Sequence, residues 1–136
     1  AMTPQAVIDG MAAVSAARPE PISTLINAML SNRPASAAAI SIARTGGALE
    51  VNIDGAEGEA VLVRFIEEAV TPVEGGDNDG LLFREAHVVT DVARLGALAG
   101  VATRFETPPP VAGTGCAVIV QEPGHGRVLA ARYCPH

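Results

Sequence analysis

Hydrophobic residues follow a helical spacing near the start of the chain and a strand spacing in the rest. Between the Pro-Glu-Pro at 19–21 and the Asn-Arg-Pro at 32–34, five apolar residues predict a helix with one apolar face: Ile22, Leu25, Ile26, Met29 and Leu30. Upstream, residues 4–9 and 11–17 predict two short strands that turn at Gly10. Such a short stretch cannot bury a core alone, and its order of elements is typical of the end of a larger α/β unit.

After Pro34 the apolar residues alternate with polar ones, a pattern typical of strands with one solvated face. Residues 38–43 and 49–54 alternate in this way on either side of a Thr-Gly-Gly turn, and they predict a hairpin. Residues 60–66 are apolar on both faces except at Arg64, so they predict a central strand.

The last third of the chain adds a strand, a rigid connector and a second hairpin. Residues 83–95 place Val and Leu at positions that suit a helix or a strand, and the neighbouring strands favour a strand. Three prolines at 108–110 predict an extended connector. Residues 116–121 and 128–133 predict a hairpin around a Pro-Gly-His-Gly turn.

These elements predict an α+β fold class in two parts. On this prediction, residues 1–34 would form the tail of an α/β unit with two strands and a helix. Residues 35–136, with about six strands, would form a small antiparallel β-sandwich. The natural boundary is Pro34.

Composition narrows the function classes. Of 136 residues 49% are hydrophobic and 3% aromatic, the net charge is −6, and the nine residues counted as Lys or Arg are all Arg. An acidic, aromatic-poor chain lacks the charge and the stacking surface that nucleic acids require. No apolar run reaches the roughly 20 residues that span a bilayer. We therefore expect no nucleic-acid partner and no integral membrane segment.

Several motifs resemble known proteins when they are taken in order. The segment 3–10, Thr-Pro-Gln-Ala-Val-Ile-Asp-Gly, resembles the segment of thioredoxin-like proteins that follows the redox motif and holds a cis-proline. With the later motifs, nearly the whole chain resembles DUF1223, a family of secreted bacterial proteins of unassigned function. These motifs are Leu62-Val63-Arg64-Phe65, Gly76-Asp77-Asn78-Asp79-Gly80, His87-Val88-Val89, Arg94-Leu95-Gly96, Val118-Ile119-Val120-Gln121-Glu122, Gly124-His125-Gly126 and Leu129-Ala130-Ala131-Arg132.

The resemblance implies a thioredoxin-like domain followed by a β-rich domain, in a protein exported to the periplasm or secreted. Residues 1–34 would correspond to the last two strands and the last helix of the thioredoxin-like domain. Members of the family carry a Cys-x-x-Cys pair in an N-terminal half, which maps to no residue of this sequence. Only Pro4 carries over, as the cis-proline that would line a substrate groove. No signal peptide is visible, and we expect a truncated or processed chain, with a divergent shortened protein as the alternative.

The two cysteines, Cys116 and Cys134, lie on opposite arms of the last predicted hairpin. A three-residue loop centred on His125 would place them directly opposite each other. A four-residue loop would pair Cys116 with Tyr133, and the apolar pattern slightly favours this second register. A structural disulfide and two independent thiols therefore both remain open, and export would favour the disulfide.

No catalytic, metal or cofactor site is predicted. No two of the three histidines, His87, His125 and His136, have ligand spacing. The acidic turn at 77–80 resembles the head of a calcium loop, but Val88 stands where the ligand Glu is needed.

Other familiar catalytic patterns are also missing. Glu67 and Glu68 are neighbours on a strand and point to opposite faces, so they do not form an acid–base pair. The chain has no Gly-x-Ser-x-Gly elbow, no dinucleotide turn and no lysine.

Three functions fit these observations. The first is a β-rich binding or structural module of an exported thioredoxin-like protein, without a catalytic centre in this chain. The second is part of a thiol–disulfide oxidoreductase whose redox cysteines lie in an N-terminal half, which would then be the partner. The third is a free-standing structural protein that covers its unfinished sheet edge with a second copy of itself.

Overall fold

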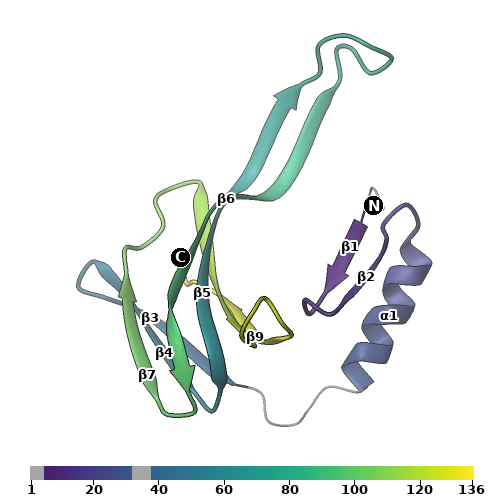
Figure 1. The fold of residues 1–136 in the computed structure, drawn as a ribbon. Coiled ribbons are helices and arrows are strands. Elements are labelled where there is room, and N and C mark those ends of the chain that lie inside the picture. The colour runs from purple at the N-terminus through teal and green to yellow at the C-terminus, as the bar shows by residue number, and fades with distance from the viewer. Residues whose placement is uncertain (1–4, 32–37) are drawn as a thin grey trace.

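The computed structural model describes residues 5–31 and 38–136 and shows an α+β fold rich in strands (Figure 1). Its described residues form one helix and three antiparallel sheets. In chain order the elements are β1 Gln5–Ile8, β2 Ala12–Ser15, α1 Pro19–Ser31, β3 Ala39–Thr45, β4 Ala48–Asp54, β5 Glu57–Pro72, β6 Leu82–Ala99, β7 Thr103–Thr107, β8 Thr114–Gln121 and β9 Val128–Tyr133. The predicted boundary at Pro34 lies outside the described residues.

The first three elements form a small unit, which we call the N-terminal unit (residues 5–31). β1 and β2 pair antiparallel and turn at Asp9 and Gly10, both of which have positive φ. Helix α1 begins at Pro19, where a proline suits the first turn because its missing N–H has no helical partner. The predicted strands and helix are confirmed. The helix, however, contains no buried residue.

The remaining strands form the predicted sandwich of two sheets, ordered β3-β4-β7 and β6-β5-β8-β9. Their facing sides supply the core, because alternate residues of each strand point inward. The largest side chains that are completely or almost completely enclosed are Leu49, Val51, Ile53, Cys116, Val118 and Val120. All buried core residues of the described chain lie between residues 38 and 134, outside the N-terminal unit.

Two parts of the sandwich test the strand predictions. The segment 60–66 was predicted to be central, and β5 does pair with β6 on one side and β8 on the other. The segment 83–95 is a strand within β6. β7 was missed, because its sequence Thr-Arg-Phe-Glu-Thr carries a single apolar residue, Phe105, and gains its register only by pairing with β4.

β5 and β6 extend beyond the sheet as a two-stranded arm, which we define as residues 67–86 (Figure 1). β5 last pairs with β8 at Ile66, whereas its pairing with β6 continues to Pro72 and Leu82. The arm is largely exposed, and its apolar side chains include Val70, Leu81, Leu82 and Phe83.

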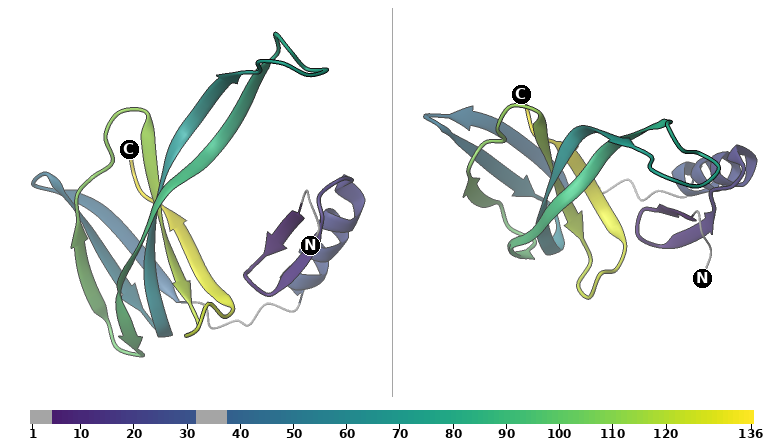
Figure 2. Two further views of the ribbon diagram at one scale, coloured as in Figure 1. Left: turned by 45° about the horizontal axis from the view of Figure 1, so that its top comes forward. Right: turned by 90° about the horizontal axis from the view of Figure 1, so that it is seen from above.

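The N-terminal unit meets the sandwich at the β1–β2 turn. The backbone N–H of Val128 donates to the carbonyl of Asp9 at 2.7 Å. An added Cβ at Gly10 would come within 2.9 Å of the Gly126 carbonyl, so the two turns touch. The four-stranded sheet lies between the three-stranded sheet and the N-terminal unit (Figure 2). In the described residues no helix has the length and apolar character to cross a membrane.

Candidate functional site around the buried disulfide

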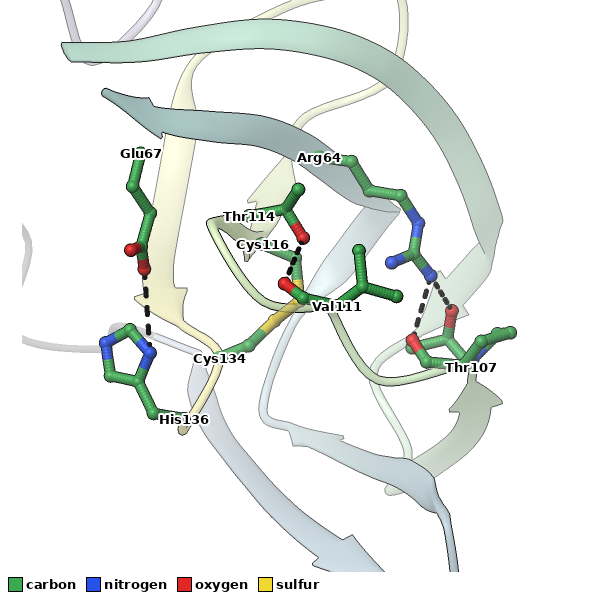
Figure 3. Close-up of a disulfide and its surroundings, with 9 residues drawn as sticks. Arg64, Glu67, Thr107, Val111, Thr114, Cys116, Cys134 and His136 are labelled. Atoms are coloured by element: carbon green, nitrogen blue, oxygen red, sulfur yellow. Dashed lines mark hydrogen bonds and ion pairs between the residues drawn. A yellow bond between two sulfur atoms is a disulfide. The ribbon is translucent and has the colours of Figure 1, made fainter. Parts of the chain in front are cut away.

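Cys116 and Cys134 form a disulfide between β8 and the residue that follows β9 (Figure 3). Their Cα atoms are 5.2 Å apart, and the N–H of Cys134 donates to the carbonyl of Cys116 at 2.8 Å. Cys116 is 1% exposed and Cys134 is 9% exposed. The bond is therefore part of the core, beside Val118, and presents little sulfur to solvent.

The strand pairing of the β8–β9 hairpin differs from the predicted register, which places Cys116 opposite Tyr133. Near the turn the prediction of a four-residue loop is confirmed. The backbone N–H of Glu122 donates to the carbonyl of Arg127, and Gln121 pairs with Val128. A bulge at Leu129 then takes up one residue, and beyond it Ala117 pairs with Tyr133. The one-residue shift brings the two cysteines opposite each other. The apolar pattern missed this because a bulge changes which face each later side chain occupies.

Three rings cover the sheet surface next to the disulfide: Phe65, His87 and Tyr133. The Phe65 ring meets the His87 ring edge-on at 4.8 Å between centroids, and the Tyr133 ring edge-on at 6.0 Å. His87 and Tyr133 stack at 5.5 Å. Phe65 also lies over Gly115 on the neighbouring strand, where an added Cβ would meet the ring at 2.6 Å. Glycine at this position therefore lets the ring lie flat on the sheet.

A pocket of about 270 Å³ opens between these rings and the end of the chain. Glu67 and His136 form one wall, with Glu67 Oε1 at 3.5 Å from His136 Nδ1 (Figure 3). The pocket thus combines an acidic group, two imidazoles and a phenol. Sequence reasoning missed this grouping, because its members come from β5, β6 and the C-terminal end of the chain and meet only through strand pairing.

His87 occupies an unusual backbone position. Its φ is +53° within β6, a conformation that costs a non-glycine residue free energy. Opposite it, the N–H of Glu67 donates to the carbonyl of Gly113. At this point the arm leaves the four-stranded sheet (Figure 1). At the base of the arm the His87 ring contacts both Phe65 and Tyr133.

Arg64, the single polar residue of the predicted central strand, joins the two sheets. One guanidinium nitrogen donates to the Thr107 hydroxyl at 3.0 Å and to the Pro108 carbonyl at 2.9 Å (Figure 3). Thr107, at the end of β7, is 8% exposed. Hydrogen bonds to both partners explain how an arginine is accommodated on an apolar strand.

The other residues considered from the sequence lie apart from this pocket. His125 is in the β8–β9 turn, with a φ of +58°. In the acidic turn at 77–80, the carboxylate of Asp79 accepts from the N–H of Gly75 at 3.0 Å. Among the described residues, no three His, Cys, Asp or Glu side chains group as metal ligands. Glu68 pairs with Arg84 on the arm, and Pro4 lies outside the described residues.

Comparisons with known proteins give a family and a fold. The model of a family described as protein of unknown function, DUF1223, matches residues 1–121. The crystal structure of protein AGR_C_4864 from Agrobacterium tumefaciens is similar over 98% of this chain and 62% of that one, with a TM-score of 0.79 and 21% identity. The chain thus spans less than two thirds of that protein, and the likeness shows the fold alone. No curated protein matches.

Proposed function

The chain belongs to the DUF1223 family, and on that premise we propose that it is a β-rich binding or structural module of an exported thioredoxin-like protein. In this proposal the module has no catalytic centre of its own. Any redox chemistry takes place in a further part of the thioredoxin-like domain, to which residues 1–34 contribute two strands and a helix.

The burial of the disulfide carries the proposal. A redox-active cysteine needs solvent access so that a thiolate can attack a substrate disulfide or be attacked by one. Cys116 and Cys134 are 1% and 9% exposed, and neither is a free thiol. Their bond closes the last hairpin beside the core, as a structural crosslink does.

The exposed N-terminal unit supports the assignment to a larger domain. Helix α1 carries five apolar residues on one face, yet Ile26 is 39% exposed and Leu30 is 57% exposed. β1 and β2 form a sheet of two strands, which is too small for independent stability. These features fit a piece of a larger α/β layer.

Export is supported by the crosslink itself. Disulfides persist in oxidising compartments such as the periplasm, whereas the cytosol keeps most thiols reduced. A disulfide between β8 and the chain segment after β9 thus fits a periplasmic or secreted protein.

The first test measures the cysteines in the purified chain. We expect no thiol to be alkylated when the protein is denatured without reductant, and two to be alkylated after reduction, at the mass of the monomer. Two alkylated thiols before reduction would contradict a structural disulfide.

The second test addresses the alternative, a thiol–disulfide oxidoreductase whose redox cysteines lie in an N-terminal half. We expect the 136-residue chain to be inactive in an insulin-reduction assay. Turnover by this chain that is lost in a Cys116→Ala and Cys134→Ala variant would place the chemistry here and overturn the proposed module.

A further inference from the structure

The two solvent-facing sides of the sandwich differ in chemistry. On the four-stranded sheet, strand pairing aligns the outward side chains in rows that cross all four strands. One row is Val92, Val63, Ala117 and Tyr133, and the next is Arg94, Val61, Ile119 and Ala131. The only charged member, Arg94, lies 3.5 Å from Glu59. We call these two rows the outer face.

The opposite side of the sandwich, formed by β3, β4 and β7, is polar. Its rows place Ser41 beside Asn52 and Arg104, and Ala43 beside Glu50 and Glu106. Arg104 pairs with both Glu50 and Glu106 at 2.9 Å. This side has the composition expected of a sheet that faces water. The outer face lacks this polar composition, although both sides belong to one small sandwich.

The outer face is also exposed in the described structure. Val92 is 61% exposed and Tyr133 is 64% exposed. A shallow, mostly apolar pocket of about 260 Å³ is lined by Ala117, Ile119, Ala131 and Tyr133, together with Arg132. An apolar surface of this kind on a sheet marks a place where another layer packs.

The location of this face indicates what covers it. The four-stranded sheet lies between the three-stranded sheet and the N-terminal unit, so its outer face is on the side of β1, β2 and α1 (Figure 2). The unit already touches this side through the Asp9–Val128 hydrogen bond. The matched protein has the same arrangement over 98% of this chain, and more than a third of its own length lies outside the match.

We propose that the outer face is the docking surface for the rest of the thioredoxin-like domain, which packs an apolar layer between it and the N-terminal unit. This inference rests on the proposed function, because it takes residues 1–34 to be part of that domain. The sandwich then acts as a support that holds the thioredoxin-like domain through Val63, Ile119 and Tyr133, and the aromatic cluster at Phe65 continues the contact to the base of the arm.

The test compares the labelling of two introduced cysteines by N-ethylmaleimide. Ala131→Cys places a thiol on the outer face, and Ser41→Cys places a matched thiol on the polar side. Both Ala131 and Ser41 are exposed in the 136-residue chain. Each variant is made in the 136-residue chain and in the polypeptide encoded by the complete reading frame. Labelling is read peptide by peptide by mass spectrometry, and circular dichroism checks the fold. Val92→Cys serves as a second outer-face site.

We expect both thiols to react at similar rates in the 136-residue chain. In the complete polypeptide we expect the outer-face thiol to react at least ten-fold more slowly, while the rate at Ser41→Cys stays unchanged. If the two thiols react at equal rates in a complete polypeptide that has an N-terminal Cys-x-x-Cys half, the docking surface is overturned and the proposed function still stands. A complete reading frame without a thioredoxin-like segment would overturn both.

A fourth outcome separates a second copy from the intramolecular partner. If the outer-face thiol is already protected in the 136-residue chain, and the protection grows with protein concentration, the face is covered by another copy. That result would also overturn the docking proposal.

Discussion

The sandwich and the N-terminal unit are built from similarly apolar sequence, yet only the sandwich encloses it. Leu49 in β4 is completely buried, whereas Leu30 in α1 is 57% exposed. The sandwich has two sheets that cover each other and a disulfide within its core. The unit has one helix beside two strands. The difference teaches that an amphipathic pattern predicts an element, while stability requires a second layer to pack against it.

The largest expected effect comes from one substitution made in both regions. Leu49→Ala should lower the free energy of unfolding of the sandwich by about 2–5 kcal/mol, because it leaves a cavity in an enclosed core. Leu30→Ala should change it by less than about 1 kcal/mol, because the side chain is already exposed. Urea unfolding measures the change in both variants. It can be followed by the fluorescence of Tyr133, because the chain has a single tyrosine and no tryptophan. Similar losses would contradict the comparison.

Removal of the disulfide should have the next largest effect, again confined to the sandwich. The bridge joins residues 18 positions apart, and closing a loop of this size stabilises a fold by about 3 kcal/mol. We expect the double variant with Cys116→Ala and Cys134→Ala to have a free energy of unfolding about 3 kcal/mol lower, as measured by urea unfolding. Hydrogen exchange of the α1 amides should stay unchanged, because no residue of the N-terminal unit lies at the bridge. Faster exchange in α1 would show that the two regions are coupled.

A smaller effect is expected at the aromatic cluster. Gly115→Ala would place a methyl group against the Phe65 ring and force the ring away from the sheet, at a cost of about 1–3 kcal/mol. Phe65→Leu in the same chain should recover part of the loss, because the shorter side chain leaves room for the methyl group. Urea unfolding of the single and double variants measures this coupling, and simple additivity would contradict the proposed clash.

The smallest effect is expected on the arm. Glu68 and Arg84 form an ion pair at 2.8 Å, but both side chains are more than half exposed. Solvent screening should limit its contribution to below about 1 kcal/mol. A double-mutant cycle of Glu68→Gln and Arg84→Gln measures it, and a larger coupling energy would indicate that the arm is more enclosed in solution than the structure shows.

Several local features could be predicted from the sequence because each depends on near neighbours. The alternation in 49–54 identifies β4, since a strand with one buried face has a period of two. The five apolar residues of α1 identify the helix for the same reason, with a period of 3.6. The two-sided apolar pattern of 60–66 correctly predicted a central strand.

Features that depend on distant partners escaped prediction. β7 has a single apolar residue, and its identity as a strand comes from pairing with β4. The pairing of the cysteines depends on a bulge at Leu129, which no local pattern indicates. The aromatic pocket assembles Phe65, His87 and Tyr133 from three strands, and the one sequence signal for it is a glycine at 115, opposite Phe65.

The sequence by itself therefore determined the elements, the α+β class and the presence of two apolar faces on β5. Only the tertiary structure decided which apolar face is enclosed, which residues meet at the pocket and that the cysteines are bonded. The reason is physical: periodicity reports that a side chain seeks cover, and the register and the packing of layers decide what provides it.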